Sequence, residues 1–432
     1  MAGGSCDSVR LMSLPASIRP SELAALIDTA AQAVEERVIA WRRDFHAHPE
    51  LGNRELRTAA IVAEHLISLG FDDVRTRVAH TGVVGVLKGA LPGPVVALRA
   101  DMDALPVTEE VDVPFASKVR TTWNGEDVGV MHACGHDCHT AILMGVATVL
   151  AGLRAQLRGT VKFIFQPAEE MPPRGEEGGA KMMIAEGALE NPTPQAIFGL
   201  HVTSRQRVGM IGVRAGPTMA SSDRFSITVH GRQTHGAAPW LGVDPIVTSA
   251  QVILGLQTVV SRGVDIAREP AVVTVGMIKG GVRENIIPDN VEMRGTIRTF
   301  DEGMRDDVHE RVTTLAEAVS RGSRAGCTVC IEKNYPVTVN HPELTALMVP
   351  TLERVAGTEH VQQVPKVTGS EDFSYFQQLV PGLFFFVGVT APEIDPAKAP
   401  ANHSPRFAVD ERALVLGVRA LSHLVCDFVE AR

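Results

Sequence analysis

Residues 95–106, V-V-A-L-R-A-D-M-D-A-L-P, form an apolar run that ends directly in two aspartates, Asp101 and Asp103. Three further apolar runs also lead to ligand-type side chains: Glu169 and Glu170 after residues 160–166, His201 after residues 196–200, and His403 beyond residues 383–389. In an open parallel sheet, binding sites form beyond the carboxyl ends of the strands. The four strands that lead to such side chains therefore predict a binding site at the carboxyl ends of the sheet strands.

Apolar runs and amphipathic segments alternate through the first half of the chain. The spacing predicts strands at Val83–Leu87, Val95–Arg99, Thr160–Gln166 and Ala196–Leu200, and helices at Ser21–Arg43, Glu55–Leu69, Ala141–Leu153 and Gly179–Glu186. The same style returns near the end, with a helix at His341–Val355, a strand at Leu383–Val389 and a helix at Glu411–Val429. This alternation predicts an α/β domain, with a mostly parallel sheet and helices on both of its faces.

The pattern between residues 216 and 335 is different. Its expected order is strand Arg224–His230, helix Pro245–Ser261, strands Ala271–Ile278 and Asn290–Phe300, helix Glu302–Arg321 and strand Thr328–Tyr335. The order β-α-β-β-α-β is typical of a ferredoxin-like α+β domain. We therefore expect one domain, made of residues 1–215 and 336–432, that is interrupted by a smaller insert at 216–335.

The length and composition indicate how many domains the chain has and which partners are excluded. A chain of 432 residues suggests two or three domains, at roughly 100–200 residues each. The 41 basic and 50 acidic residues give a net charge of −9, and the absence of a basic run argues against nucleic acid and anionic membranes as partners. No apolar run approaches the roughly 20 residues of a membrane span. Residues 1–20 lack an apolar signal core, so we expect a cytoplasmic protein; the periplasm stays open if a signal peptide has been removed.

The six cysteines are too few for a disulfide framework. Cys134 and Cys138 stand among histidines, which indicates a ligand thiolate in a reducing compartment. Cys327 and Cys330 form a C-x-x-C, but they fall in a strand-like run, where positions three apart point to opposite faces. We therefore interpret them as two ordinary packed thiols.

The segment M-H-A-C-G-H-D-C-H-T, residues 131–140, is rich in side chains that bind metals. Cys134 and His136 are two positions apart, which fits a turn and not one face of a helix. Such a turn alone could be structural. Together with Glu169 and Glu170, it favours a divalent ion of the zinc, manganese, cobalt or nickel kind, beside which a carboxylate can bridge or act as a base.

Several ordered motifs now point to a known family: F-H-A-H-P-E-L-G, R-A-D-M-D-A-L-P, M-H-A-C-G-H-D, F-Q-P-A-E-E, G-L-H, N-I-I-P, G-S-E-D-F and N-H-S-P. The chain resembles the metallo-aminoacylase/carboxypeptidase amidohydrolases over residues 41 to 410. Within them it is most similar to hippurate hydrolases, N-acyl-amino-acid amidohydrolases and plant indoleacetyl-amino-acid hydrolases.

The resemblance implies two divalent ions per subunit, bound by Cys134, His136, Glu170, His201 and His403, with Cys134 as the bridge. It implies that Glu169 is the general base and that Asp103 orients a ligand. It also implies that the insert is a lid that carries the dimer contact, so that a homodimer or a larger homo-oligomer is expected. T-H-G-A-A-P-W departs from the commonest lid motif, although His235 keeps the position of the lid histidine, and Cys138 stands where a small residue is common. Neither departure removes a ligand.

Two further residues are candidates for substrate binding. The resemblance implies that Asn285 reaches the substrate from the lid, and the alternative is a plain turn residue after two glycines. Arg298 could grip a substrate carboxylate with its guanidinium fork. It would share one strand face with Arg294, four positions away, and the alternative for both is a solvated charge.

The implied activity is hydrolysis of the amide bond of small N-acyl amino acids to a carboxylic acid and a free amino acid. A metal-bound hydroxide would attack the carbonyl, and hippurate-like or ochratoxin-like aromatic acyl amides would be substrates. A dipeptidase or carboxypeptidase that uses the same two-metal site is the alternative. A non-catalytic binding protein and a metal-storage or redox thiol protein are less favoured, because the complete ligand set is present.

Overall fold

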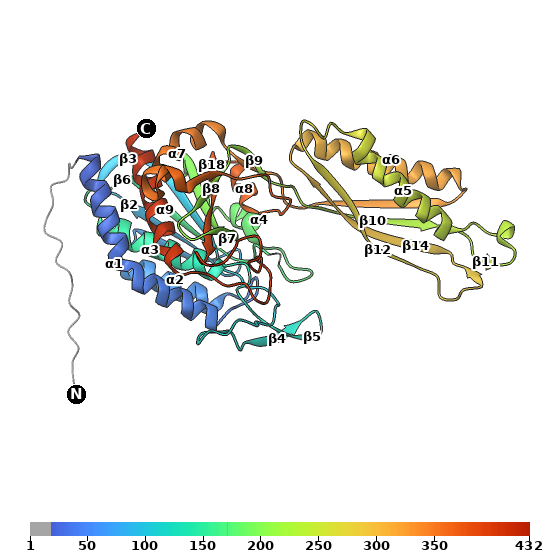
Figure 1. The fold of residues 1–432 in the computed structure, drawn as a ribbon, viewed down its shortest axis with the longest axis horizontal. Coiled ribbons are helices and arrows are strands. Elements are labelled where there is room, and N and C mark those ends of the chain that lie inside the picture. The colour runs from blue at the N-terminus through green and yellow to red at the C-terminus, as the bar shows by residue number, and fades with distance from the viewer. Residues whose placement is uncertain (1–18, 171) are drawn as a thin grey trace. The chain divides into compact units, whose positions relative to one another are not determined.

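The computed structural model describes residues 19–170 and 172–432, and the chain divides into two compact units (Figure 1). The first unit comprises Met1–Gly212, Leu347–Gln362 and Phe384–Arg432, and the second comprises Val213–Ala346 and Gln363–Leu383. The second unit therefore includes the insert expected at 216–335, together with neighbouring segments. Cys6 and the expected absence of a signal core fall in residues 1–18, outside the described part.

The first unit is built on an eight-stranded sheet in the order β1-β2-β6-β3-β7-β18-β8-β17. Its strands are β1 (Asp73–Val78), β2 (Gly82–Lys88), β3 (Leu91–Asp101), β6 (Arg158–Gln166), β7 (Ala196–Arg207), β8 (Ile211–Val213), β17 (Val361–Gln363) and β18 (Gly382–Thr390). The central strand β3 is parallel to both β6 and β7, whereas β1 with β2, β2 with β6, and β18 with β8 are antiparallel. The expected α/β fold class is confirmed, with antiparallel pairing added toward the edges.

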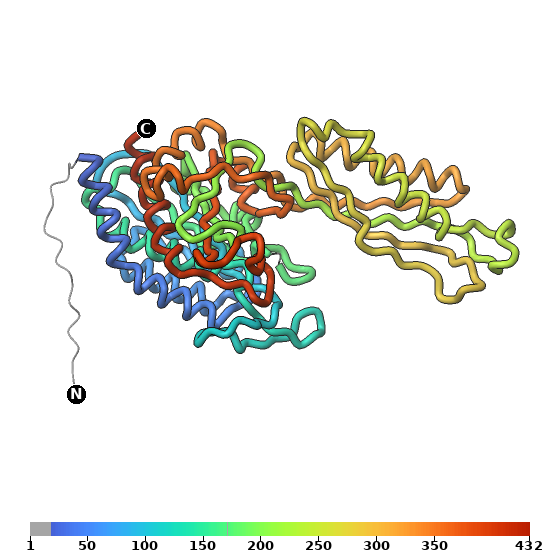
Figure 2. The backbone as a smooth tube through the Cα atoms, in the orientation of Figure 1, coloured from blue at the N-terminus to red at the C-terminus, as the bar shows by residue number. Residues whose placement is uncertain are grey.

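Both faces of this sheet are covered. Successive side chains of a strand point to opposite faces, yet every residue of β18 and all but the last of β2 are buried. The helices of this part are α1 (Pro20–Ala47), α2 (Leu56–Ser68), α3 (His136–Gly152), α4 (Gly179–Ala185), α7 (Pro342–Ala356) and α9 (Arg412–Glu430). Helices α3 and α9 pack on β3, β6 and β7, and α1 lies against both of these helices (Figures 1 and 2).

The second unit contains a four-stranded antiparallel sheet in the order β12-β14-β10-β15. Its elements are β10 (Asp223–His230), α5 (Pro245–Gly263), β12 (Ala271–Gly280), β14 (Asn290–Thr299), α6 (Glu302–Gly322) and β15 (Gly326–Lys333). Phe225, Ile227 and Val229 alternate along β10, and their buried side chains form a core with residues of α5, β14 and α6. The predicted order β-α-β-β-α-β is confirmed.

Short elements complete the fold: β4 (Arg120–Trp123), β5 (Glu126–Gly129), β9 (Gly216–Met219), β11 (Thr234–His235), β13 (Ile286–Ile287), β16 (Thr338–Asn340) and α8 (Phe373–Gln377). Strands β4 and β5 pair as a hairpin around Asn124 and Gly125, whose φ angles of +52° and +88° match the Asn-Gly turn that suits a two-residue hairpin. The sequence patterns do not foresee these strands, because two to four residues are too few to show a periodicity.

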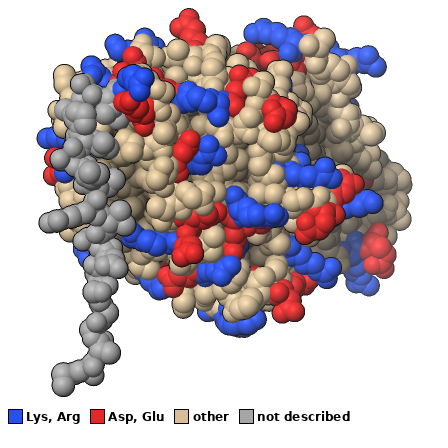
Figure 3. Space-filling view, turned by 60° about the vertical axis from the view of Figure 1, so that its left-hand side comes forward, with Lys and Arg blue, Asp and Glu red and all other residues tan. Residues whose placement is uncertain are grey.

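Basic and acidic side chains are interspersed over the face drawn in Figure 3. Cys327 is half-buried against the core of the second unit, whereas Cys330 is exposed on the other face of β15. Cys327 and Cys330 point to opposite faces of β15, as expected, but the expectation of two packed thiols is wrong for Cys330, which is exposed. The five described cysteines are free thiols. Among the described residues, no helix has both the length and the hydropathy that crossing a membrane requires.

Candidate metal centre

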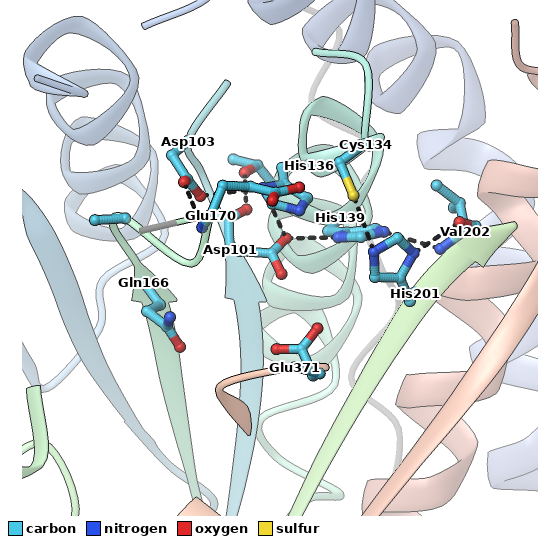
Figure 4. Close-up of polar contacts among 12 residues, drawn as sticks. Asp101, Asp103, Cys134, His136, His139, Gln166, Glu170, His201, Val202 and Glu371 are labelled. Atoms are coloured by element: carbon cyan, nitrogen blue, oxygen red, sulfur yellow. Dashed lines mark hydrogen bonds and ion pairs between the residues drawn. The ribbon is translucent and has the colours of Figure 1, made fainter. Parts of the chain in front are cut away.

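Separate segments of the first unit bring ligand-type side chains to one place (Figure 4). Asp101 is the last residue of β3, and the pair Glu169–Glu170 follows β6. The other contributions are Cys134 and His136 at the start of α3, His201 in β7, and His403 in the loop before α9. The structure thus gathers all five expected metal ligands from segments that are far apart in the chain.

Cys134 stands at the centre of this group. Its Sγ lies 3.3 Å from Nε2 of His201 and 3.3 Å from Nε2 of His403. The cysteine belongs to two sets of possible ligands, one with His136 and His201 and one with Glu170 and His403, and the ligand atoms of each set lie within 4.8 Å of one another. A thiolate that is shared by two such sets has the geometry of a bridge between two ions.

Two buried ligand atoms in the described part of the chain have no hydrogen-bond partner: Nε2 of His136 and Oε1 of Glu170. Oε1 of Glu170 also lies 2.8 Å from Nε2 of His403, with which it forms an ion pair when that ring is protonated. A buried polar atom that is left unpaired costs about 1–3 kcal/mol. Metal ions bound by these atoms would remove that cost, so the residues fit a metal centre.

The charge balance of the site also favours cations. Burial, followed by the negative charges of Glu170 and Glu169, raises the pKa of the Cys134 thiol well above its usual value. Burial would lower the pKa of His136, but the carboxylates of Asp101 and Asp103 outweigh it and raise that pKa to about 10. Negative groups therefore dominate the site. Divalent cations would reverse this effect and stabilise Cys134 as a thiolate.

Two of the histidines are oriented by their other ring nitrogen. Nδ1 of His136 donates to Oδ1 of Asp103 at 3.1 Å, and Nδ1 of His201 donates to the carbonyl oxygen of Val202 at 2.7 Å. Each bond leaves Nε2 free to bind a metal, which is the usual arrangement of metal-binding histidines. Burial lowers the pKa of His201 well below its ordinary value and so favours the neutral imidazole that binds metals.

Asp101 and His139 lie beside the candidate ligands and hydrogen-bond to each other. Nδ1 of His139 donates to Oδ1 of Asp101 at 2.5 Å, and its Nε2 accepts the N–H of Val202 at 2.9 Å. Asp101, His136 and His139 also have ligand spacing. Both nitrogens of His139 are already used, however, which assigns His139 to positioning and not to metal binding.

The turn that carries Glu169 and Glu170 is held by a buried carboxylate. Ala168 has a φ of +51°, in the left-handed region, and its N–H donates to Oε1 of Glu55 at 2.9 Å. The hydroxyl of Thr81 donates to the other oxygen of Glu55 at 2.5 Å. Glu169 is buried, and its ligand atom lies within 4.8 Å of those of His136 and Glu170. This places the expected general base beside the expected ligands.

The sequence matches peptidase family M20/M25/M40 over residues 97–427. The chain belongs to this family. A family member of known structure, the Bacillus subtilis YXEP protein, is described as a dinuclear metal binding peptidase of the M20 family. It is 35% identical to this chain, with a TM-score of 0.77, over 93% of this chain and 100% of that one. The family resemblance seen in the motifs is confirmed.

Two curated relatives extend the comparison within the M20/M25/M40 family. Thermostable carboxypeptidase 2 of Saccharolobus solfataricus is 40% identical over 94% of this chain and 99% of its own length. The N-acyl-L-amino acid amidohydrolase of Geobacillus stearothermophilus is 41% identical over 74% of this chain and 82% of its own length. The protein is therefore a metal-dependent hydrolase of the amidohydrolase and peptidase kind.

The remaining expected site residues of this M20/M25/M40 member lie in the second unit, and two of them are neighbours. Strands β11 and β13 pair His235 with Ile286, and the N–H of Gly236 donates to the carbonyl oxygen of Asn285 at 2.8 Å. His235 and Asn285, which are 50 positions apart in the sequence, therefore lie side by side and exposed.

Arg298 lies elsewhere in that unit, on β14. It is half-buried, and its Nη1 donates to the hydroxyl of Ser370 at 3.0 Å. Arg294 shares its strand face, as expected, but Nε of Arg294 donates to Glu292 at 2.6 Å on the same face. This face of β14 therefore carries an acidic residue as well as two arginines. Arg294 is paired with Glu292, whereas Arg298 is not.

Reasoning from the sequence missed the residues that hold the site in place. From the sequence, Asp101 is only a polar strand end, Glu55 only the first residue of an expected helix, and Asn402 only a part of N-H-S-P. His46 stands in F-H-A-H-P-E-L-G without an assigned role, and its ring nitrogens lie 2.8 Å from Asp137 and 3.0 Å from Glu109. Only the match of whole motifs could have signalled these roles, since each contact joins segments distant in sequence.

Proposed function

We propose that the protein hydrolyses the amide bond of N-acyl amino acids to a carboxylic acid and a free amino acid. The observation that carries the proposal is the sharing of Cys134 by two ligand sets, with Glu169 beside them. The relative named N-acyl-L-amino acid amidohydrolase supports this substrate class. Hippurate-like and ochratoxin-like aromatic amides are the compounds we would test first.

We propose that Cys134, His136, Glu170, His201 and His403 would hold two divalent ions of zinc, manganese, cobalt or nickel, since Cys134 belongs to both ligand sets. Such ions polarise a carbonyl and lower the pKa of water toward neutrality. Glu169 takes the proton from the attacking water on its carboxylate and passes it to the leaving nitrogen. Asp103 holds Nδ1 of His136 and so keeps Nε2 turned toward the ions.

In the insert, residues 216–335, we assign three residues to the substrate. His235 donates to the oxyanion that develops on the carbonyl, and Asn285, its neighbour, adds a second donor. Arg298 binds the free carboxylate of the amino acid, because a guanidinium can grip a carboxylate with two hydrogen bonds. A clamp of this kind orients the amide and selects substrates that keep a free carboxylate.

We propose that the insert is also a lid and the contact of a homodimer. β12 is the edge strand of its sheet, and Val272, Met277 and Ile278 on it are exposed. Helix α5 exposes Val247 and Leu254. A free strand edge with apolar residues favours pairing with a second copy. A dimer with one lid contact per copy is thus the assembly we expect, and Cys134 as a thiolate favours a reducing compartment such as the cytoplasm.

A carboxypeptidase or dipeptidase is the second candidate, because one relative is named a thermostable carboxypeptidase. The two functions separate in one assay. Benzoyl-glycine, benzoyl-phenylalanine and acetyl-amino acids are compared with free dipeptides, at equal concentration and with Mn²⁺ or Co²⁺ present. The proposal expects kcat/KM to be highest on an N-acyl amino acid. A preference for dipeptides with a free amino group would favour the alternative.

A further inference from the structure

The side-chain amide of Asn402 ties its own loop to two backbone segments of the metal centre, the turn at Cys134 and strand β7. Its Nδ2 donates to the carbonyl oxygen of Cys134 at 2.9 Å and to that of Val202 at 3.1 Å. Its Oδ1 accepts the N–H of Ser204 at 3.3 Å. Both amide hydrogens and one acceptor site are therefore used, and each bond reaches a segment at least 198 positions away in the sequence.

The carbonyl oxygen of Val202 connects the side-chain amide of Asn402 with the candidate ligand His201. The same oxygen accepts the Nδ1–H of His201 at 2.7 Å, which sets the plane of that ring. The N–H of Val202 is held by His139 at 2.9 Å. Asn402 therefore holds the Val202 carbonyl that orients the ring of His201, while His139 holds the N–H of the same residue.

His403, which follows Asn402 in the sequence, has an unfavourable backbone conformation. His403 has a φ of +74°, and a non-glycine residue in the left-handed region costs about 1–3 kcal/mol. Its N–H donates to the carbonyl oxygen of Ala133 at 2.7 Å. Since Asn402 bonds to the carbonyl of Cys134, two successive residues of this loop are tied to two successive residues before α3.

We propose that Asn402 is a positioning residue that sets the mutual placement of Cys134, His201 and His403. It touches none of their ligand atoms. It bonds to the carbonyl of Cys134 and to the Val202 carbonyl that accepts from His201, and it directly precedes His403 in the chain. The proposal rests on the two-ion centre of the proposed function. Partners that orient metal ligands in this way are typically worth about 10–100-fold in metal affinity when they are lost.

Two variants test the role by opposite physical effects. Asn402→Ala removes all three bonds. Asn402→Asp keeps an acceptor for Ser204 but turns an oxygen toward two carbonyl oxygens, while it adds negative charge near the cations. Charge alone would tighten metal binding, whereas lost positioning weakens it. We expect both variants to bind Co²⁺ about 10–100-fold more weakly in a chelator competition, with a changed thiolate-to-cobalt absorption band.

Asn340→Ala is the matched control. Asn340 is a fully buried amide of the second unit, and its Nδ2 donates to the carbonyl oxygen of Arg214 at 2.8 Å. This control should lower the melting temperature and leave Co²⁺ affinity unchanged. Equal weakening in Asn340→Ala, or unchanged or tighter binding in both Asn402 variants, overturns the proposal. If the wild-type protein binds no Co²⁺, the two-ion centre itself fails, so the two failures are distinguishable.

Discussion

Asp103 accepts the backbone N–H of Glu170 on its Oδ2 at 2.9 Å. Its Oδ1 takes the ring N–H of His136 at 3.1 Å. One carboxylate from the segment after β3 therefore connects a ligand at the end of β6 with a ligand at the start of α3. This connection explains how neighbouring parallel strands, which end at the same edge of the sheet, are turned into a single metal centre.

Replacing Glu169 by Gln should separate proton transfer from metal binding. The amide keeps the shape of the side chain but cannot take a proton, so we expect kcat to fall by about 10²–10⁴-fold. Metal content should remain that of the wild type, because the five ligands are intact. Glu177→Gln, an exposed carboxylate in the loop that follows, serves as the control with normal kcat. A near-normal kcat in Glu169→Gln would mean that the base is another residue.

His235→Ala should lower kcat by about 10²–10³-fold, the cost of one oxyanion donor, with a smaller change in KM. The family resemblance implies that this histidine serves the site of the partner subunit. Mixing Glu169→Gln chains with His235→Ala chains should then restore part of the activity. Verified mixed dimers without any recovery would show that His235 acts within its own subunit.

Arg298→Ala should cost most of kcat/KM on N-acyl amino acids and little on their methyl esters, because the ester lacks the charge that the guanidinium binds. Arg294→Ala is the matched control, since Arg294 shares the strand and the face but is paired with Glu292. If the wild-type protein cleaves the methyl ester as fast as the free acid, Arg298 does not bind the substrate carboxylate and its role is structural.

His65 predicts a pH dependence of stability that is independent of the metal ligands. Its Nε2 lies 3.1 Å from the carbonyl oxygen of Met144 and 3.0 Å from the hydroxyl of Thr148, and burial lowers its pKa to about 4. The neutral ring is favoured in the folded state and the charged ring in the unfolded state, whose pKa is about 6.5. The stabilisation is therefore complete above about pH 6.5 and is lost as the pH falls to about 4.

Urea unfolding of the wild type and of His65→Gln measures this effect. The loss should amount to at most about 3.4 kcal/mol in the wild type, because the pKa falls from about 6.5 to about 4 on folding. His65→Gln, which cannot titrate, should lack it. Parallel pH curves for the two proteins would contradict the assignment.

Much of the fold follows from local patterns. The alternation of apolar runs and amphipathic segments predicts five of the eight strands of the first sheet, namely β2, β3, β6, β7 and β18, and the period-two alternation of apolar residues in β10 predicts a strand of the second sheet. Strands β8 and β17 are missed because three residues each carry no period. β8 pairs with the longer strand β18, and β17 lies beside β8 at the edge of the sheet.

The candidate metal ligands and the orienting Asp103 could be proposed from the motifs, but Asn402 and Glu55 could not, for a physical reason. Cys134 and His136 have the chemistry of ligands wherever they occur, so residue type and position at a strand end or helix start are informative. The bond between Asn402 and Cys134 joins residues 268 positions apart. The sequence around Asn402 contains nothing that depends on that contact, so only the folded chain reveals it.

The central claim is that two ions, bridged by Cys134, are required for amide hydrolysis. Metal-free protein is titrated with Co²⁺ while bound metal, the thiolate-to-cobalt absorption and the hydrolysis of benzoyl-glycine are followed on the same sample. We expect two ions per chain, activity that appears with them, and no such absorption band in Cys134→Ala. Full hydrolysis by the metal-free protein, or a band that persists without Cys134, would contradict the account.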